Sequence, residues 1–172
     1  MIKMLSELLQ ATFRNDKKFI SIEEELYHTK NYLNLQKIRY SDFFDIKWDI
    51  DEKCLKYATI KFLLQPICEN AIYHGIKNAE FFCYIKISIK ENKNTIILTV
   101  ENTGKTMGKE TVRELNKILN KNTDLESSHI GLKNVNKRIK IAFGEKYGCF
   151  MNSEDEKTTV TITIPKSQIW KN

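Results

Sequence analysis

The feature that most constrains the fold is a change in the spacing of apolar residues near residue 44. Before this point apolar residues recur at the period of a helix, and from here they alternate with charged residues. The two alternating sets are Phe44, Ile46, Trp48, Ile50 and Asp45, Lys47, Asp49. A period of two predicts a strand with one buried face. The chain therefore needs both helices and a sheet.

Residues 1–41 are expected to form a helical extension of a domain that occupies residues 42–172. Apolar residues at helical spacing from Met1 to about Asn15 predict the end of a helix that continues upstream. Ser21 and Glu24 form a Ser-x-x-Glu capping box, which predicts that a second helix begins there and extends to about Tyr40.

The rest of the chain alternates between helical and strand-like patterns. The predicted elements are a helix over 60–74, a hairpin of strands over 85–89 and 96–100, helices over 112–119 and 131–143, and a hairpin over 147–152 and 158–164. We expect Gly75 to end the first of these helices at a positive φ. This order predicts an α+β two-layer sandwich, in which helices cover one face of a mixed, mostly antiparallel sheet.

Charge and cysteine spacing disfavour several kinds of function. The net charge of +6 comes from 28 basic and 22 acidic residues that are scattered through one another, whereas a nucleic-acid binder needs a basic cluster. Cys54, Cys68, Cys83 and Cys149 are too far apart for a zinc knuckle, and we expect buried, reduced thiols. The sequence contains no run of about 18 apolar residues, so it predicts no membrane-spanning helix.

Residues 64–75, Leu-Gln-Pro-Ile-Cys-Glu-Asn-Ala-Ile-Tyr-His-Gly, are the most informative segment. They place Glu69, Asn70 and His74 on adjoining parts of one surface of an otherwise apolar helix, where polar groups need partners. Taken alone, the segment is equally compatible with a helix whose Asn70 caps a neighbouring loop.

This segment resembles the N box of the GHKL ATPases, in the form found in YesM-type and LytS-type sensor histidine kinases. The resemblance implies the Bergerat (GHKL) fold, with ATP and Mg²⁺ as ligands. It further implies that Asn70 ligates Mg²⁺, an ion that prefers oxygen ligands. Glu69 would orient or deprotonate an attacking group near the γ-phosphate, and His74 would belong to the nucleotide-binding set.

Two further segments resemble boxes of the same family. Gly131-Leu132-Lys133-Asn134-Val135, with Arg138, is similar to the G2 box. Here backbone amides at a helix start form an anion site, to which Lys133 and Arg138 add positive charge. Alone, this pattern also fits an ordinary capped helix. We expect the nucleotide to lie between this helix and the helix that bears Asn70.

The segment Val100–Met107 falls where the family carries an Asp-x-Gly-x-Gly box that binds adenine. Asn102 takes the place of the aspartate, Gly104 matches the first glycine, and Thr106 replaces the second. The asparagine oxygen can still accept from the adenine amino group, but a neutral hydrogen bond is weaker by roughly 1 kcal/mol or more. His129 likewise replaces a glycine of the G2 region.

The resemblance covers nearly the whole chain and implies the catalytic ATP-binding domain of a two-component sensor histidine kinase. The γ-phosphoryl group would pass to a histidine upstream of this chain, because neither His28 nor His74 lies in the family's Asn-Pro-His-Phe motif. It would then pass to a response regulator of the AraC or LytTR type. The full-length protein would be a homodimer, with this domain on the cytoplasmic side of a bacterial membrane and attached only through upstream segments.

Two alternatives remain open at this point. A degenerate domain that serves as a dimerisation or docking scaffold would explain Asn102, Thr106 and His129. A basic nucleic-acid binder is a third possibility, and it predicts an affinity for DNA that falls steeply with salt.

Overall fold

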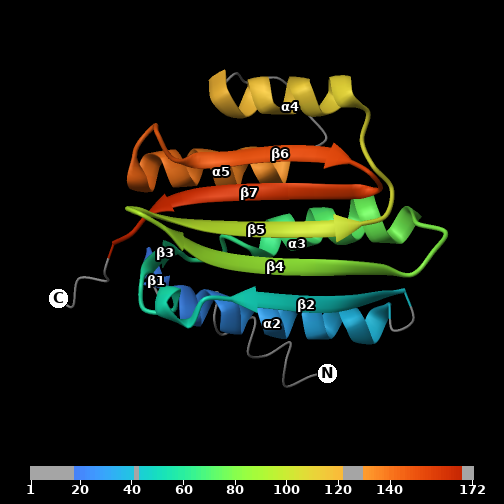
Figure 1. The fold of residues 1–172 in the computed structure, drawn as a ribbon, viewed down its shortest axis with the longest axis horizontal. Helices are drawn as coiled ribbons and strands as arrows, with labels where there is room; N and C mark the ends of the chain where they lie inside the picture. Colours follow the sequence, from blue (N-terminus) through green and yellow to red (C-terminus); the bar gives the residue numbers. More distant parts are fainter. Residues whose placement is uncertain (1–17, 41–42, 122–129, 168–172) are drawn as a thin grey trace.

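The computed structural model describes residues 18–40, 43–121 and 130–167, which form a mixed five-stranded sheet with helices on one side and a separate two-stranded sheet. The five strands lie in the order β2-β4-β5-β7-β6 (Figure 1). Their bounds are β2 Phe44–Ile50, β4 Cys83–Asn92, β5 Thr95–Thr103, β7 Lys157–Pro165 and β6 Gly148–Glu154. Strand β2 is parallel to β4, and all other neighbours are antiparallel. The mixed, mostly antiparallel sheet is confirmed.

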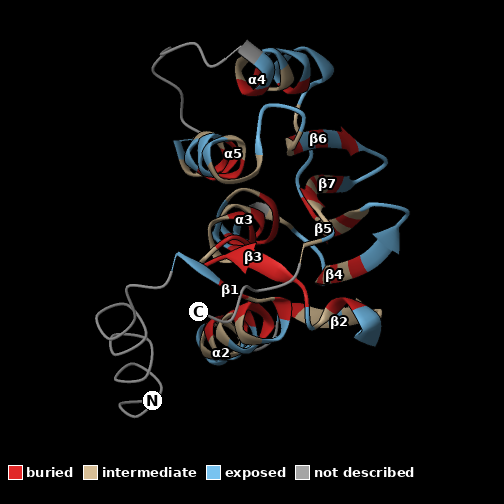
Figure 2. Cartoon of the chain, turned by 90° about the vertical axis from the view of Figure 1, so that its left-hand side faces the viewer, coloured by how far each residue is buried: buried red, intermediate tan, exposed pale blue. Residues whose placement is uncertain are grey.

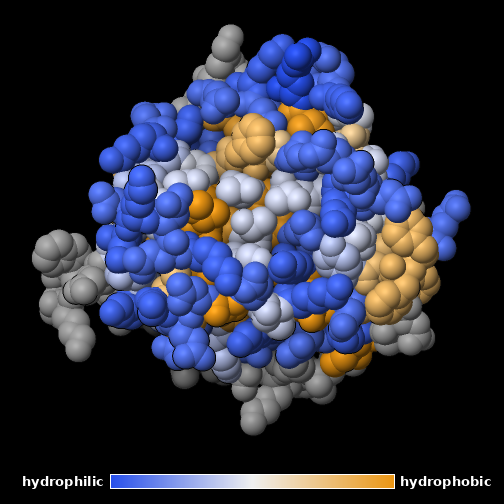
Figure 3. Space-filling model, viewed as in Figure 1, coloured by the Kyte–Doolittle hydropathy of each residue, from blue (hydrophilic) through white to orange (hydrophobic). Residues whose placement is uncertain are grey.

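The helices form the second layer. Helices α2 (Ile22–Arg39), α3 (Gln65–Asn70) and α5 (Ile130–Phe143) cover one face of the sheet, whereas α4 (Lys109–Lys121) lies at its edge beside β6 (Figure 2). The opposite face of the sheet is open to solvent and mostly hydrophilic (Figure 3). The predicted two-layer α+β sandwich is therefore confirmed, as are both long hairpins and the helices near residues 112–119 and 131–143.

Helix α2 begins where the capping box predicts. The Ser21 hydroxyl accepts a hydrogen bond from the Glu24 amide at 3.0 Å, which satisfies one of the free amides of the first turn. Acidic residues occupy that first turn and basic residues the last, so the charges at both ends interact favourably with the helix dipole. Ile22, Leu26 and Leu33 then bury the side of α2 that faces the core.

The prediction of a helix over residues 60–74 is wrong at its start. Residues Ala58–Ile60 form strand β3, which pairs with β1 (Phe19–Ser21). Helix α3 begins at Gln65, next to Pro66, because proline fits the first helical turn, where its missing N–H is not needed. It continues as a π-helical turn over Ala71–Gly75 (η2) and a 3₁₀ turn over Ile76–Asn78 (η3).

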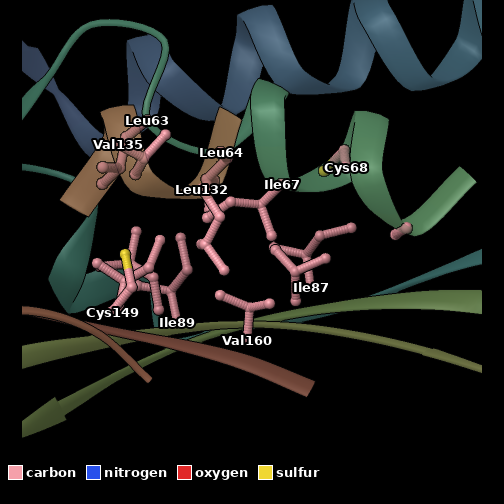
Figure 4. Close-up of a cluster of buried hydrophobic side chains, with 14 of the residues drawn as sticks. Leu63, Leu64, Ile67, Cys68, Ile87, Ile89, Leu132, Val135, Cys149 and Val160 are labelled. Carbon is pink, nitrogen blue, oxygen red and sulfur yellow. The ribbon is translucent and has the colours of Figure 1, made fainter. Parts of the chain in front are cut away.

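The core lies between the helices and the inner face of the sheet. Alternate residues of three central strands point into it, and all are buried: Ile85, Ile87, Ile89, Ile96, Leu98, Val100, Val160, Ile162 and Ile164. They face apolar side chains of α3 and α5, among them Ile67, Leu132 and Val135 (Figure 4). All four cysteines are buried and free, as predicted.

Some predictions fall outside the described residues. These are the helix over residues 1–15 and the position of His129. Among the described residues, no helix combines the length and the apolar character that crossing a membrane requires.

Candidate functional site

The inner face of the sheet is apolar except at one end, where it carries three buried polar side chains. Asn102, Ser153 and Thr158 occupy inward positions on β5, β6 and β7. The Ser153 and Thr158 hydroxyls lie 2.8 Å apart, and Ser153 also accepts a hydrogen bond from the Met107 amide at 3.0 Å. Because strands alternate, these side chains must face the helices, and they supply hydrogen-bonding groups beneath α3.

A pocket of about 340 Å³, including the part open to solvent, lies at this polar end between α3 and the sheet. Its lining residues are Ile67, Asn70, Ala71, His74, Gly75, Val100, Asn102, Lys105, Met107, Met151, Thr158 and Val160. The pocket therefore joins three of the predicted site residues, Asn70, His74 and Asn102, on an otherwise mainly apolar lining.

Gly75, Asn102 and Gly104 approach one another closely at the pocket. A Cβ atom on Gly75 would lie 2.1 Å from Asn102 Nδ2, and one on Gly104 would lie 2.6 Å from the Gly75 carbonyl oxygen. Gly104 also has a φ of 127°, which other residues rarely adopt. Asn102 Nδ2 donates to the Thr103 carbonyl at 3.1 Å.

The expected positive φ at Gly75 is wrong, because its φ is −89°. Any residue can adopt that backbone conformation. The absence of a side chain there is explained instead by the contact with Asn102, which a larger residue would displace from the wall of the pocket.

Asn70 and Gly131 bring α3 and the start of α5 together. A Cβ atom on Gly131 would lie 3.6 Å from Asn70 Nδ2 and 3.9 Å from Asn70 Oδ1. Helix α5 begins at Ile130, so the amides of Gly131 and Leu132 belong to its first turn, where N–H groups lack partners within the helix. The pocket itself lies on the sheet side of α3, with Asn70 in its lining.

The other predicted residues of these helices lie around this contact. Glu69 is exposed and accepts a hydrogen bond from Gln65 Nε2 at 3.0 Å. The Leu132 side chain is buried in the core, so only its backbone could serve a ligand. Lys133 is half-buried on α5.

Arg138 does not add charge at the start of α5, contrary to the prediction. Its guanidinium donates hydrogen bonds to the carbonyl oxygens of Lys61 and Phe62. Arg138 lies seven residues after Gly131, which at 1.5 Å per residue is roughly 10 Å along the helix. The side chain therefore holds the loop before α3 rather than the anion site.

Of the twelve lining residues, Asn70, His74 and Asn102 were predicted as site residues from the sequence, whereas the other nine, which include Lys105, Met151 and Thr158, were not. For Thr158 a signal was present, because it continues the inward series of Val160, Ile162 and Ile164 with a polar side chain. A polar residue at the inward end of an apolar strand indicates a site.

The side chains available for a metal ion are few. Within the described part of the chain, no group of three or more His, Cys, Asp or Glu side chains could hold one. Asn70 is half-buried in the pocket lining, and among the described residues its side chain has no hydrogen-bond partner. Its amide oxygen fits Mg²⁺, which takes one or two protein ligands and fills its other positions with phosphate and water.

Comparison with known families gives two matches. A family model described as histidine kinase-, DNA gyrase B-, and HSP90-like ATPase matches residues 57–168, which include the whole pocket. A second, described as histidine kinase, matches residues 1–44.

Curated relatives include two bacterial sensor proteins. The chain is 32% identical over 169 residues to sensor histidine kinase YesM of Bacillus subtilis, covering 96% of this chain and 27% of that protein. It is 31% identical over 147 residues to sensor protein LytS of Staphylococcus saprophyticus, covering 85% of this chain and 24% of that protein. The chain thus spans about a quarter of the length of these relatives.

Solved structures show the same fold at low identity. The catalytic domain of histidine kinase ThkA aligns with a TM-score of 0.64 and 17% identity, over 87% of this chain and 97% of that one. Histidine kinase ThkA in complex with response regulator protein TrrA aligns with a TM-score of 0.64 and 14% identity, over 99% of this chain and 49% of that one.

Proposed function

The chain belongs to the family of histidine kinase-, DNA gyrase B- and HSP90-like ATPases, and from this premise we propose that it is the ATP-binding catalytic domain of a sensor histidine kinase. Membership in the family implies that the chain binds ATP. The observation that carries the proposal is the pocket in which Asn70, His74 and Asn102 meet at the polar end of the sheet.

Adenine would occupy the pocket between α3 and the sheet. The apolar lining, which includes Ile67, Val100 and Val160, suits the faces of a flat ring. Asn102 would accept from the adenine amino group, with Gly104 allowing the close approach of the backbone. Thr158 lies on the strand beside Asn102, paired with it in register, and would support the same edge of the ring.

The phosphates would lie toward Asn70 and the first turn of α5. The free amides of Gly131 and Leu132 and the charge of Lys133 favour an anion there. Asn70 would hold Mg²⁺, and the ion, when bound, neutralises phosphate charge. Exposed Glu69, one residue before Asn70, would orient the attacking group. Such sites act by positioning the reactants and by stabilising charge.

The phosphoryl acceptor would be a histidine outside this chain. His28 packs against the rings of Tyr27 and Phe62 on the helical side, and His74 is part of the pocket itself. We propose transfer of the γ-phosphoryl group to a histidine nitrogen, with ADP as the leaving group, and then to the aspartate of a response regulator. The regulator would be of the AraC or LytTR type.

The cellular setting is also a proposal. The relatives are named as sensor proteins of bacteria. In that setting the domain would face the cytoplasm in a homodimeric membrane sensor.

Nucleotide titration tests the proposal. Calorimetric titration of the chain with ATP, in excess Mg²⁺ and in EDTA, should show saturable binding that Mg²⁺ strengthens. Asn70→Ala should remove the Mg²⁺-dependent gain. The control is Asn152→Ala, an exposed residue of the edge strand outside the pocket lining, which should bind as the wild type does.

Two results would sink the proposal: no saturable binding, or binding that Asn70→Ala leaves unchanged. Thermal melting separates the scaffold alternative, because a ligand that binds the native state must raise the midpoint. An unmoved midpoint in millimolar Mg-ATP would favour the scaffold.

A further inference from the structure

Glu25 is a buried carboxylate that lies outside the pocket. It belongs to α2, and only 1% of the residue is exposed. Its Oε1 accepts hydrogen bonds from the amides of Leu63 and Leu64 at 2.7 and 2.8 Å, and its Oε2 accepts from the Phe62 amide at 2.8 Å. A single carboxylate thus binds three successive amides of one loop. Burying it costs free energy, which these three bonds partly offset.

These three amides lead directly into α3. Leu64 is the residue that precedes the helix, and no side chain of its own caps the first turn. The amides at a helix start need partners from elsewhere. Glu25 accepts from the amide of Leu64 and from the two amides before it, and it does so from a different helix, 37 to 39 residues earlier in the sequence.

Arg138 of α5 binds the carbonyl oxygens of the same loop. Its guanidinium donates to Lys61 and Phe62, so the loop is bound through donors on one side and acceptors on the other. Phe62 has a φ of 55°, which is uncommon for a bulky residue and persists only where the surroundings fix it. The loop conformation therefore depends on α2 and α5 together.

We propose that Glu25 is a positioning residue, which sets where α3 places Asn70 against Gly131 and the pocket. The inference rests on the proposed function. Helix α3 has only six residues, so a shift of its first turn is carried to Asn70 at its end. Residues 1–44, which match the histidine kinase model, include α2. A displacement of α2 would therefore reach the nucleotide site through this carboxylate.

A double-mutant cycle on the 172-residue chain tests this role. The variants are Glu25→Gln, Asn70→Ala and the combination of the two, and the readout is the ratio of ATP affinities in excess Mg²⁺ and in EDTA. In Glu25→Gln an amide NH₂ group faces a loop N–H, donor against donor. The ratio should fall roughly tenfold or more, the usual loss when a group that orients a metal ligand is removed.

The cycle separates positioning from general stability. If Glu25 acts through Asn70, the double variant should lose no more of the ratio than Asn70→Ala alone. Glu23→Gln is the matched control: it lies on the same helix and is exposed, and it should keep the wild-type ratio. The proposal would be overturned if Glu25→Gln kept the wild-type ratio, or if the reduction of the ratio in the double variant equalled the sum of the reductions in the two single variants.

Arg138→Lys decides the question if Glu25→Gln does not fold. Lysine keeps the charge but cannot bind both carbonyl oxygens with a planar fork, so the ratio should fall in the same direction. A wild-type ratio in Arg138→Lys would then overturn the proposal. Failure of the proposed function looks different, because the wild-type chain itself would show no Mg²⁺-dependent gain, or Asn70→Ala would keep it.

Discussion

Replacing Gly75 with alanine places a methyl group where the structure has no room for one. The new Cβ would lie 2.1 Å from Asn102 Nδ2 and 3.1 Å from Asn102 Cγ. Asn102 is buried and short, so its amide can retreat only by giving up its hydrogen bond to the Thr103 carbonyl. The substitution thus disturbs both the packing and the pocket wall at which we propose that adenine binds.

The expected cost follows from three contributions. Overpacking costs about 2 kcal/mol, and the lost hydrogen bond adds about 1 kcal/mol. Because φ at Gly75 is −89°, alanine fits the backbone and returns about 1 kcal/mol through the unfolded state. The net loss is about 2 kcal/mol, which lowers the melting temperature of a chain of this size by about 4–8 °C.

Urea denaturation of Gly75→Ala and of Gly75→Ala/Asn102→Ala provides the assay. Removing the Asn102 amide relieves the clash. The stability loss of the double variant should therefore be smaller than the sum of the losses of the two single variants, by about 1 kcal/mol or more. Gly108→Ala is the control, since its methyl would meet only Thr111 Oγ1 at 3.8 Å, and it should cost less than about 1 kcal/mol. Equal losses in Gly75→Ala and Gly108→Ala, or additive losses in the double variant, would refute the reasoning.

Three further predictions concern the buried carboxyl group of Glu25, the attachment of α4 to the sheet, and the buried thiols. Burial raises the pKa of Glu25 from 4.5 to about 7, although the hydrogen bonds from three amides and the charge of Arg138 on α5 act to lower it. The Cys68 thiol of α3 also lies near this carboxyl group. The protonated form therefore contributes stability that is fully present below pH 4.5 and is lost as pH rises through 7, by roughly 3 kcal/mol. Urea denaturation across this pH range should show the loss in the wild type. A Glu25→Gln chain whose stability depends on pH in the same way would contradict the prediction. Asn116→Ala removes two hydrogen bonds to the Met151 backbone at the sheet edge and should cost about 1–3 kcal/mol in urea, and a loss below about 0.5 kcal/mol would disprove the anchoring of α4. Burial raises the pKa of all four thiols, so Ellman's reagent should react at the rate of unfolding, and fast reaction in the native chain would contradict their burial.

The sequence predicts elements whose pattern is local. The alternation from Phe44 to Ile50 and the capping box at Ser21 are each complete within a few residues, and both elements form as expected. The start of α3, by contrast, is determined by contacts with residues that are distant in sequence. The loop before it is held by Glu25 and Arg138, which are distant in sequence, and no spacing of apolar residues reports such contacts.

The candidate site was predictable where a motif fixes the residue and not where geometry does. Asn70 and Asn102 stand at motif positions, and the structure places both in one pocket. The direction of Arg138 could not be predicted, because sequence proximity to Gly131 does not show on which turn a long side chain finds its partner. The reason for Gly75 was likewise hidden, since the contact involves a strand 27 residues further along.

Nuclear magnetic resonance of the ¹⁵N-labelled chain during addition of Mg-ATP tests the central claim most directly. The side-chain amides of Asn70 and Asn102 and the backbone amides of Gly75 and Gly104 should shift with one saturable dissociation constant. Backbone amides of residues whose side chains alternate to the open face of the sheet, such as Lys86 and Thr161, should stay in place. Shifts confined to that open face, or no shifts at millimolar Mg-ATP, would contradict a nucleotide site between α3 and the sheet.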